Sequence, residues 1–272
     1  MSLSDLVRPG GAVSHTDSTV SAESGSVVVD GVSKAFGGGP ERVLALDRIS
    51  LDVRPGEFVC MVGASGCGKS TLLNLIADLD RPSAGSVTTE GRVTLMFQES
   101  ALFPWLTVEG NINLALKLRG IPRKERPAQT LELLRSVQLD DFAKRLPHEL
   151  SGGMRQRVAI ARAFAQDVEI LLMDEPFGAL DAMTRDLLHD ELERLWESRG
   201  ITVVFVTHNV REAVRLADRV VLLSSRPGRV VEEFAVDIAR PRRIDGVEVT
   251  TLAASITDRL REEVRHHAVD VH

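Results

Sequence analysis

The sequence contains the stretch Gly63-Ala64-Ser65-Gly66-Cys67-Gly68-Lys69-Ser70-Thr71, which matches the pattern G-x-x-x-x-G-K-[ST]. A short apolar run precedes it and a segment with helical character follows, so it lies between an expected strand and an expected helix. The glycines let successive backbone N–H groups converge on phosphate oxygens, and the positive end of the helix adds to this attraction. We expect Lys69 to reach the β- and γ-phosphates and Ser70 to ligate Mg²⁺. An ordinary glycine-rich turn is the alternative, but strand, loop and helix together predict a nucleoside triphosphate site.

The composition is typical of a globular protein with one large domain or two small ones. The chain has 272 residues, of which 43% are hydrophobic and 26% charged. Its formal net charge of -6 argues against a general nucleic-acid binder, which would show a net basic footprint. No apolar run reaches the roughly 20 residues that span a bilayer. Residues 1–25 lack the hydrophobic segment of a signal peptide, and we expect them to form a disordered leader.

The chain has two cysteines, Cys60 on an expected buried strand and Cys67 in the phosphate loop. We do not expect a disulfide between them, and two free thiols fit a reducing cytosol. Zinc is not expected either, because no His or Cys pair lies nearby at ligand spacing.

Alternating strand and helix patterns predict an α/β fold with a mainly parallel sheet and helices on both faces. Besides the strand 57–62, which leads into the phosphate loop, we expect strands at residues 93–97, 170–173, 201–206 and 219–223. Helices are expected at residues 183–199 and 210–217. A β portion comes first, with a strand at 26–30 and a pair of strands at 43–46 and 49–53.

Two further regions differ in pattern from this core. Residues from about 107 to 147 have helical spacing, broken at Pro122 and Pro127, and predict a helical insert. Beyond residue 228 we expect a charged tail with one helix at about 251–264. The predicted organisation is therefore a leader (1–25), a nucleotide-binding domain (26–228) with a helical subdomain at about 99–165, and a tail (229–272).

Polar residues follow three of the expected strands where they end: Gln98, Asp174 with Glu175, and His208. Ligands of parallel α/β sheets bind beyond these carboxyl ends, where the phosphate loop also lies. We expect Asp174 to hold Mg²⁺, directly or through water, and Glu175 to act as general base for the attacking water. His208 would hold the γ-phosphate or the water, and Gln98 would touch Mg²⁺ and water. The alternatives are a helix cap for Asp174, a surface acid for Glu175 and a structural role for His208.

A second anion-binding helix end is predicted at Ser151-Gly152-Gly153. It offers a capping hydroxyl and free N–H groups, although a good N-cap alone would have the same residues. We call a site where free backbone N–H groups face an anion an anion cradle, and a chain with one phosphate loop seldom needs a second one. A two-fold dimer explains both, with each helix end closing on the partner's γ-phosphate.

These residues together resemble the ATP-binding subunit of ABC transporters. The resemblance covers residues 27–223 and rests on six motifs in order: Walker A (63–71), the Q-loop Gln98, the signature Leu150-Ser151-Gly152-Gly153, Walker B (170–174) with Glu175, the D-loop Ala179-Leu180-Asp181, and the switch histidine His208. It implies an ABC ATPase fold: a P-loop core with a mainly parallel sheet, an N-terminal antiparallel β portion and a helical subdomain insert.

The resemblance also implies roles for particular residues. Phe36 takes the adenine-stacking position, where the family often has Tyr, and a ring without a hydroxyl still stacks. Met154 stands where the family often has Gln, and we expect little effect from it. The catalytic group is Glu175, His208, Lys69 and Gln98. Nucleotide is bound by Phe36, by Gly63 to Thr71 and by Ser151, Gly152, Gly153 and Asp181, and Mg²⁺ by Ser70, Gln98 and Asp174.

Finer likeness points to the importers for nitrate, taurine and aliphatic sulfonates. It rests on residues 98–108 with Asn111-Ile112, on residues 150–157 and on residues 223–228. It implies a homodimer that sandwiches two Mg-ATP at the cytoplasmic face of the cell membrane. A separate permease, supplied by a solute-binding protein, would contact the cleft beside Gln98. The run Leu102-Phe103-Pro104-Trp105 would line that surface, unless Trp105 belongs to the core.

Two other classes of function remain open. A non-transport ABC ATPase could act as a clamp on nucleic acid or the ribosome, but the interval between Gln98 and Ser151 is too short for a long coiled-coil insertion, and no motif repeats. A phosphoryl-transfer kinase is the third option, and the second anion cradle argues against it.

Overall fold

The computed structural model describes residues 24–178 and 180–270. Nearly all of the expected leader lies outside these residues. The larger of its two sheets has six strands in the order β5-β6-β7-β3-β8-β9. These strands are β3 (Phe58–Gly63), β5 (Val93–Met96), β6 (Ile170–Asp174), β7 (Thr202–Val206), β8 (Arg219–Leu223) and β9 (Val230–Ala235). The first five of these are parallel, as predicted, and β9 runs antiparallel to β8.

Seven α-helices accompany the sheets within the described residues: α1 (Lys69–Ile76), α2 (Val108–Leu118), α3 (Arg126–Ser136), α4 (Gly152–Ala165), α5 (Ala182–Arg199), α6 (Val210–Leu216) and α7 (Val247–Asp270). Four of them begin at side chains that cap the first turn: Thr107 for α2, Ser151 for α4, Asp181 for α5 and Asn209 for α6. Helix α5 ends at Gly200, which adopts a left-handed conformation as a helix stop requires.

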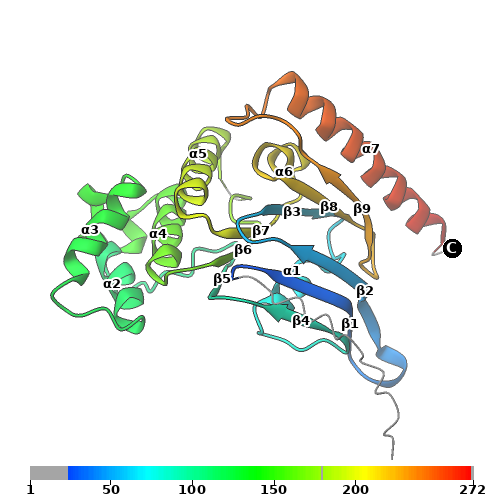
Figure 1. Ribbon diagram of the computed structural model, residues 1–272, viewed down its shortest axis with the longest axis horizontal. Helices are drawn as coiled ribbons and strands as arrows, with labels where there is room; N and C mark the ends of the chain where they lie inside the picture. The colour runs from blue at the N-terminus through cyan, green and yellow to red at the C-terminus, as the bar shows by residue number, and fades with distance from the viewer. Residues whose placement is uncertain (1–23, 179, 271–272) are drawn as a thin grey trace, which may run out of the picture.

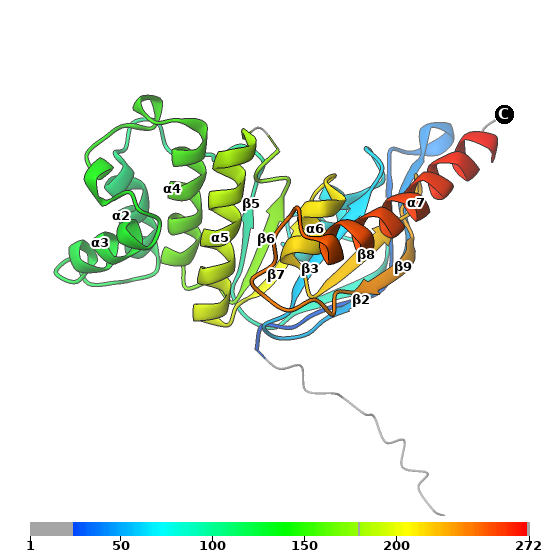
Figure 2. The same cartoon turned by 90° about the horizontal axis from the view of Figure 1, so that it is seen from above.

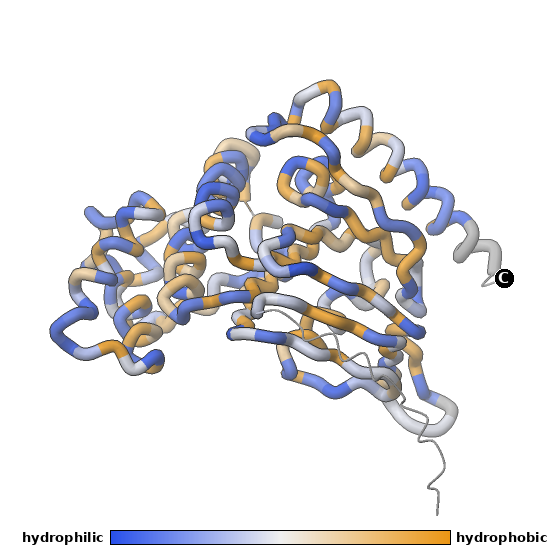
Figure 3. The backbone as a smooth tube through the Cα atoms, viewed as in Figure 1, coloured by the Kyte–Doolittle hydropathy of each residue, from blue (hydrophilic) through white to orange (hydrophobic). Residues whose placement is uncertain are grey.

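The two faces of the large sheet carry separate apolar cores. On one face Val59 and Met61 of β3 pack with α1 and the smaller sheet. On the other face Phe58 and Cys60 pack with residues of α4, α5 and α6. Every residue of β3 is therefore buried, which is typical of a parallel strand covered on both faces. Figure 3 shows this apolar centre between the more hydrophilic outer helices.

The smaller sheet is antiparallel and has the order β2-β1-β4. It consists of β1 (Val27–Phe36), β2 (Val43–Val53) and β4 (Ala84–Thr89). The prediction of a strand pair within residues 43–53 was wrong, because this segment is one strand that pairs with β1. The register shifts near Arg48, whose positive φ of 49° marks an irregularity that interrupts the apolar pattern.

Helices α2, α3 and α4 form a group at one end of the molecule (Figures 1 and 2). They come from the region between β5 and β6, where the sequence predicts the helical insert. Helix α7 packs on α6 through a face that includes Val249, Ala253 and Ile256, and from there it runs toward the opposite end of the molecule (Figure 2). The predicted tail differs from the structure in two ways: its first part adds β9 to the large sheet, and its helix begins at Val247. Among the described residues, no helix combines the length and apolarity needed to cross a membrane.

Candidate active site

The phosphate loop joins the end of β3 to the start of α1. Gly68 has a φ of 102°, and a Cβ there would lie 2.5 Å from Leu46 Cδ2, so only glycine fits. No side chain caps α1, which leaves its first N–H groups free to meet a ligand. Residues 63–71 therefore have the shape of a loop that can bind an anion, and the phosphate site predicted there stays a prediction.

Lys69 is held within this loop. Its Nζ donates to the carbonyl oxygens of Gly63 at 2.9 Å and Ala64 at 3.0 Å, and the residue is only 6% exposed. Both acceptors are neutral, so the ammonium keeps its charge available for a phosphate. Cys67 lies beside it, with its Sγ 3.7 Å from Lys69 Nζ, and is buried in the loop.

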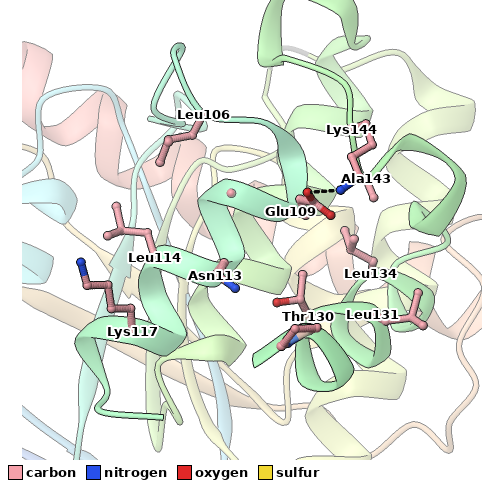
Figure 4. A pocket seen from close by; sticks show the side chains of 12 residues that line it. Leu106, Glu109, Asn113, Leu114, Lys117, Thr130, Leu131, Leu134, Ala143 and Lys144 are labelled. Carbon is pink, nitrogen blue, oxygen red and sulfur yellow. Dashed lines mark hydrogen bonds and ion pairs between the residues drawn. The ribbon is translucent and has the colours of Figure 1, made fainter. Parts of the chain in front are cut away.

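A cavity of about 370 Å³ opens above the loop. Lys69, Ser70 and Thr71 line one part of it, and Phe36 and Glu175 line its other walls. Phe36 is 45% exposed, and Lys34 Nζ lies 5.0 Å from the centroid of its ring, so part of the ring is open for stacking. Residues predicted to bind phosphate, to stack on the base and to accept a proton therefore face one space. The larger cavity of about 530 Å³ lies away from these groups, between α2 and α3 (Figure 4).

The carboxyl ends of β6 and β7 bring two titratable groups together. His208 Nδ1 lies 2.9 Å from Glu175 Oε2. Asp174 pairs with Val206 across the two strands, and Glu175 continues this pairing through its N–H, which donates to Val206 O at 2.9 Å. Glu175 has a φ of 46°, a strained backbone conformation of the kind that clusters at functional sites.

Gln98 approaches the same place from the end of β5. A Cβ placed on Gly178 would lie 3.6 Å from Gln98 Nε2 and 3.8 Å from Glu175 Oε2, so both side chains reach this glycine. The structure also reveals Gln156, which sequence reasoning missed. Its Nε2 donates to Gln98 O at 2.8 Å and to Pro176 O at 2.7 Å, and so ties α4 to both loops.

A buried network supports the segment around His208. His189 of α5 is fully buried, and its Nε2 lies 2.7 Å from Glu212 Oε1. The other oxygen of Glu212 accepts from the Thr207 hydroxyl, which in turn accepts from Asn209 N at 3.0 Å. Residues on both sides of His208 are thereby fixed. In the sequence, His189 and Glu212 are isolated residues on two expected helices, and no pattern there indicates that they interact.

The signature residues lie at the start of α4. Ser151 caps the helix by accepting from Met154 N at 3.2 Å, and Gly153 packs closely on Thr184 of α5. Asp181 caps α5 by accepting from the backbone and hydroxyl of Thr184, and these hydrogen bonds lower the pKa of its carboxyl group. Gly152 lines a separate cavity of about 480 Å³. The two predicted anion cradles of one chain therefore lie at two different cavities.

The residues at the phosphate loop fit a magnesium ion only together with a nucleotide. Ser70 lines the phosphate-loop cavity, and Asp174 ends β6 next to Glu175, which also lines it. Both residues carry the oxygen atoms that Mg²⁺ prefers, and Mg²⁺ commonly binds through one or two protein oxygens plus phosphates and water. Among the described residues, no group of three His, Cys, Asp or Glu side chains could hold a metal ion by itself.

Comparisons with known proteins agree with this geometry. A model of the ABC transporter family matches residues 46–178. An uncharacterized ABC transporter ATP-binding protein of Methanocaldococcus jannaschii is 46% identical, over 87% of this chain and 91% of its own. The taurine import ATP-binding protein TauB of Rhizobium johnstonii is 48% identical over 82% and 88%. The nitrate import ATP-binding protein NrtD of Synechocystis is 46% identical over 76% and 81%.

Solved structures show the same fold. A dimeric ATP-binding cassette in a post-hydrolysis state, bound to ADP and phosphate, is 35% identical with a TM-score of 0.69, over 78% of this chain and all of its own. The fold and site define a P-loop ATPase of the cassette type. The chain belongs to the ABC transporter ATP-binding proteins, a family that hydrolyses ATP.

Proposed function

We propose that the chain is the ATP-hydrolysing subunit of an importer for a small anion such as nitrate, taurine or an aliphatic sulfonate. The contact between His208 and Glu175 at 2.9 Å, facing the phosphate loop, supports the hydrolytic part most directly. The names of TauB and NrtD support the choice of cargo, and a bicarbonate transport protein at 48% identity widens the range of anions. The cargo itself would not touch this subunit.

Each residue has a role that follows from its position. Lys69 and the N–H groups of the loop bind the β- and γ-phosphates, and Phe36 stacks on the adenine. When bound, Mg²⁺ neutralises charge on the phosphate oxygens, held by Ser70 and Asp174. Glu175 accepts the proton of the attacking water.

Two residues complete the site around that water. His208 holds Glu175 by its side-chain contact and is placed to orient the γ-phosphate or the water. Gln98 reaches the same region from the next strand end and touches Mg²⁺ and water in this scheme. His208 contacts the carboxylate, and Gln98 reaches Gly178 together with Glu175, although it lines the cavity beside the start of α4. The loss of either residue should therefore slow hydrolysis more than nucleotide binding.

Two copies are required to complete each site in this proposal. Ser151, Gly152 and Gly153 lie outside the phosphate-loop cavity of their own chain. In a two-fold dimer these N–H groups close on the γ-phosphate held by the partner, and Asp181 lies at the start of the adjoining helix. The solved cassettes at 35% and 36% identity, both described as dimeric, support this arrangement.

A membrane permease is the proposed partner at the cytoplasmic face of the membrane, with a solute-binding protein acting through it. The loop before α2 presents Trp105 with 73% of its surface exposed, so a core role for Trp105 is excluded. Asn111 holds the loop in shape, because its side chain accepts from Phe103 N at 2.9 Å and donates to Leu106 O at 3.2 Å. A rigidly held, exposed aromatic residue suits a protein contact.

The importer proposal is tested by co-purification from detergent-solubilised membranes of the source cells. We expect a membrane protein to accompany the wild-type chain and to be lost with Trp105→Glu. Val247→Glu is the matched control, since Val247 is 80% exposed at the start of α7, outside the loop before α2. Both variants should keep the ATPase activity of the isolated subunit. Co-purification of nucleic acid or ribosomes instead would favour the clamp.

A further inference from the structure

The loop that follows β8 is built against the phosphate loop. Gly228 N donates to Ala45 O at 2.8 Å, and Gly228 O accepts from Asp47 N at 2.9 Å, so the loop continues alongside β2. A Cβ on Gly228 would lie 2.2 Å from Cys67 O, a backbone atom, so no side chain fits there. Ser224 Oγ closes the loop by accepting from Arg229 N and donating to Pro227 O, both at 2.9 Å.

This construction brings Arg226 to the nucleotide cavity. The guanidinium lines the same cavity as Phe36 and Lys69. Its Nε lies 3.4 Å from Gly66 O, a long hydrogen bond that holds the group only weakly. Its Nη2 lies 3.4 Å from the position of a Cβ on Gly66, so it covers the tip of the phosphate loop.

Arg226 differs from the other arginine of this loop. Arg229 pairs with Asp47, with its Nε 2.9 Å from the carboxylate. Within the part of the chain that the structure describes, Arg226 has no carboxylate within ion-pair distance. A guanidinium that faces a phosphate-binding cavity without a carboxylate partner is suited to bind an anion, because its planar donors match phosphate oxygens.

We propose that Arg226 is a nucleotide-binding residue that contacts the phosphate chain of bound ATP as a second cation beside Lys69. The inference rests on the proposed role of the phosphate loop and adds a residue from the loop after β8, the strand that pairs with β3. The contact also links the segment after β8, and through it β9, to nucleotide occupancy.

The test measures binding without turnover, by titrating the purified chain with ADP and with adenosine. Arg226→Ala should weaken ADP binding about tenfold, as the loss of one charge-assisted hydrogen bond predicts. Adenosine, which has no phosphate, should bind equally to wild type and variant. Arg226→Lys should retain part of the ADP affinity. Arg229→Ala removes the same charge from the same loop and should keep ADP affinity within about twofold, because its charge is already paired.

Lys69→Ala, measured in parallel, separates the hypothesis that the phosphate loop binds nucleotide from the hypothesis that Arg226 contacts the phosphates. If Lys69→Ala loses ADP binding while Arg226→Ala keeps it, the inference is overturned and the phosphate loop stands. If neither variant loses ADP binding, the proposed site itself is wrong. If Arg226→Ala weakens the binding of ADP and of adenosine equally, Arg226 does not contact the phosphates and the inference is overturned. Because Arg226 is exposed, its variants should keep the wild-type melting temperature.

Discussion

Glu175 combines a strained backbone, a place at a strand end and a side-chain contact with His208. Changing Glu175→Gln keeps the shape but removes the group that accepts a proton from water. We predict that ATP turnover falls about 100-fold or more while ATP remains bound. Steady-state hydrolysis and equilibrium nucleotide binding, measured on the same preparation, check this prediction. Turnover near the wild-type rate would show that Glu175 is not the base.

Cys67 provides a chemical probe of the loop. Both thiols are buried, and burial raises the pKa of Cys60 well above its usual value, so Cys60 should not react. We predict that a small alkylating reagent inactivates the protein slowly through Cys67, because an added group there collides with the phosphates, and that MgATP protects. Mass spectrometry identifies the modified residue. An inactivated sample with unmodified Cys67 would contradict this account.

The sequence predicts the residues that stand in motifs more completely than those that act through tertiary contacts. Glu175 and His208 both follow apolar strands, and parallel pairing then brings them to one edge. Gln156 and Arg226 lie within stretches that carry the likeness to importers, residues 150–157 and 223–228, but neither follows a buried strand, so their positions in the sequence do not show what they contact. Only in the folded chain does Arg226 lie against Gly66 and Gln156 against Gln98.

At the scale of elements, apolar runs predict the buried strands, while exposed strands escape detection. The prediction of β8 at residues 219–223 is confirmed, because that strand is almost entirely buried. Strand β4 was missed, since none of its residues is fully buried and it has only one large apolar residue, Val87. Strand β9 was missed for a similar reason: it is an edge strand with Glu232 and Glu233 at its centre.

The junction of α4 and α5 depends on the absence of a side chain at Gly153. A Cβ there would lie 2.2 Å from Thr184 Cγ2, whereas a Cβ on Gly152 would lie 3.5 Å from its nearest neighbour, on Leu180. We predict that Gly153→Ala lowers the free energy of unfolding by about 1–3 kcal/mol through overpacking. Gly152→Ala should be neutral or stabilising by up to about 1 kcal/mol. Denaturant unfolding curves of the two variants provide the comparison.

A second substitution tests the cause of that loss. Thr184→Ser removes Cγ2 but keeps the hydroxyl that donates to Asp181 Oδ2 at 2.7 Å. Adding it to Gly153→Ala should restore most of the lost stability. If the double variant is as unstable as Gly153→Ala alone, the clash with Thr184 is not the reason.

At the scale of the whole molecule, the separation of the two anion cradles is the feature that most needs a partner. The phosphate loop opens into one cavity and the start of α4 lies by another, although both belong to one chain. The two motifs alone predicted a dimer from the sequence, but they did not predict which cavity each motif faces. If each site is shared, Lys69→Ala disables both sites of its homodimer, and so does Ser151→Arg. In a mixed dimer both lesions fall in one site, and the other has an intact phosphate loop and an intact signature.

The most direct measurement is therefore ATP occlusion or single-turnover hydrolysis after the two inactive variants are mixed. The shared-site account predicts recovery that rises with the fraction of heterodimer and is greatest near equal amounts of the two variants. Steady-state cycling can stay low, because closure can require both sites to be filled. If heterodimers form, as shown by differently tagged chains, and no mixing ratio restores occlusion or hydrolysis, the shared site is contradicted.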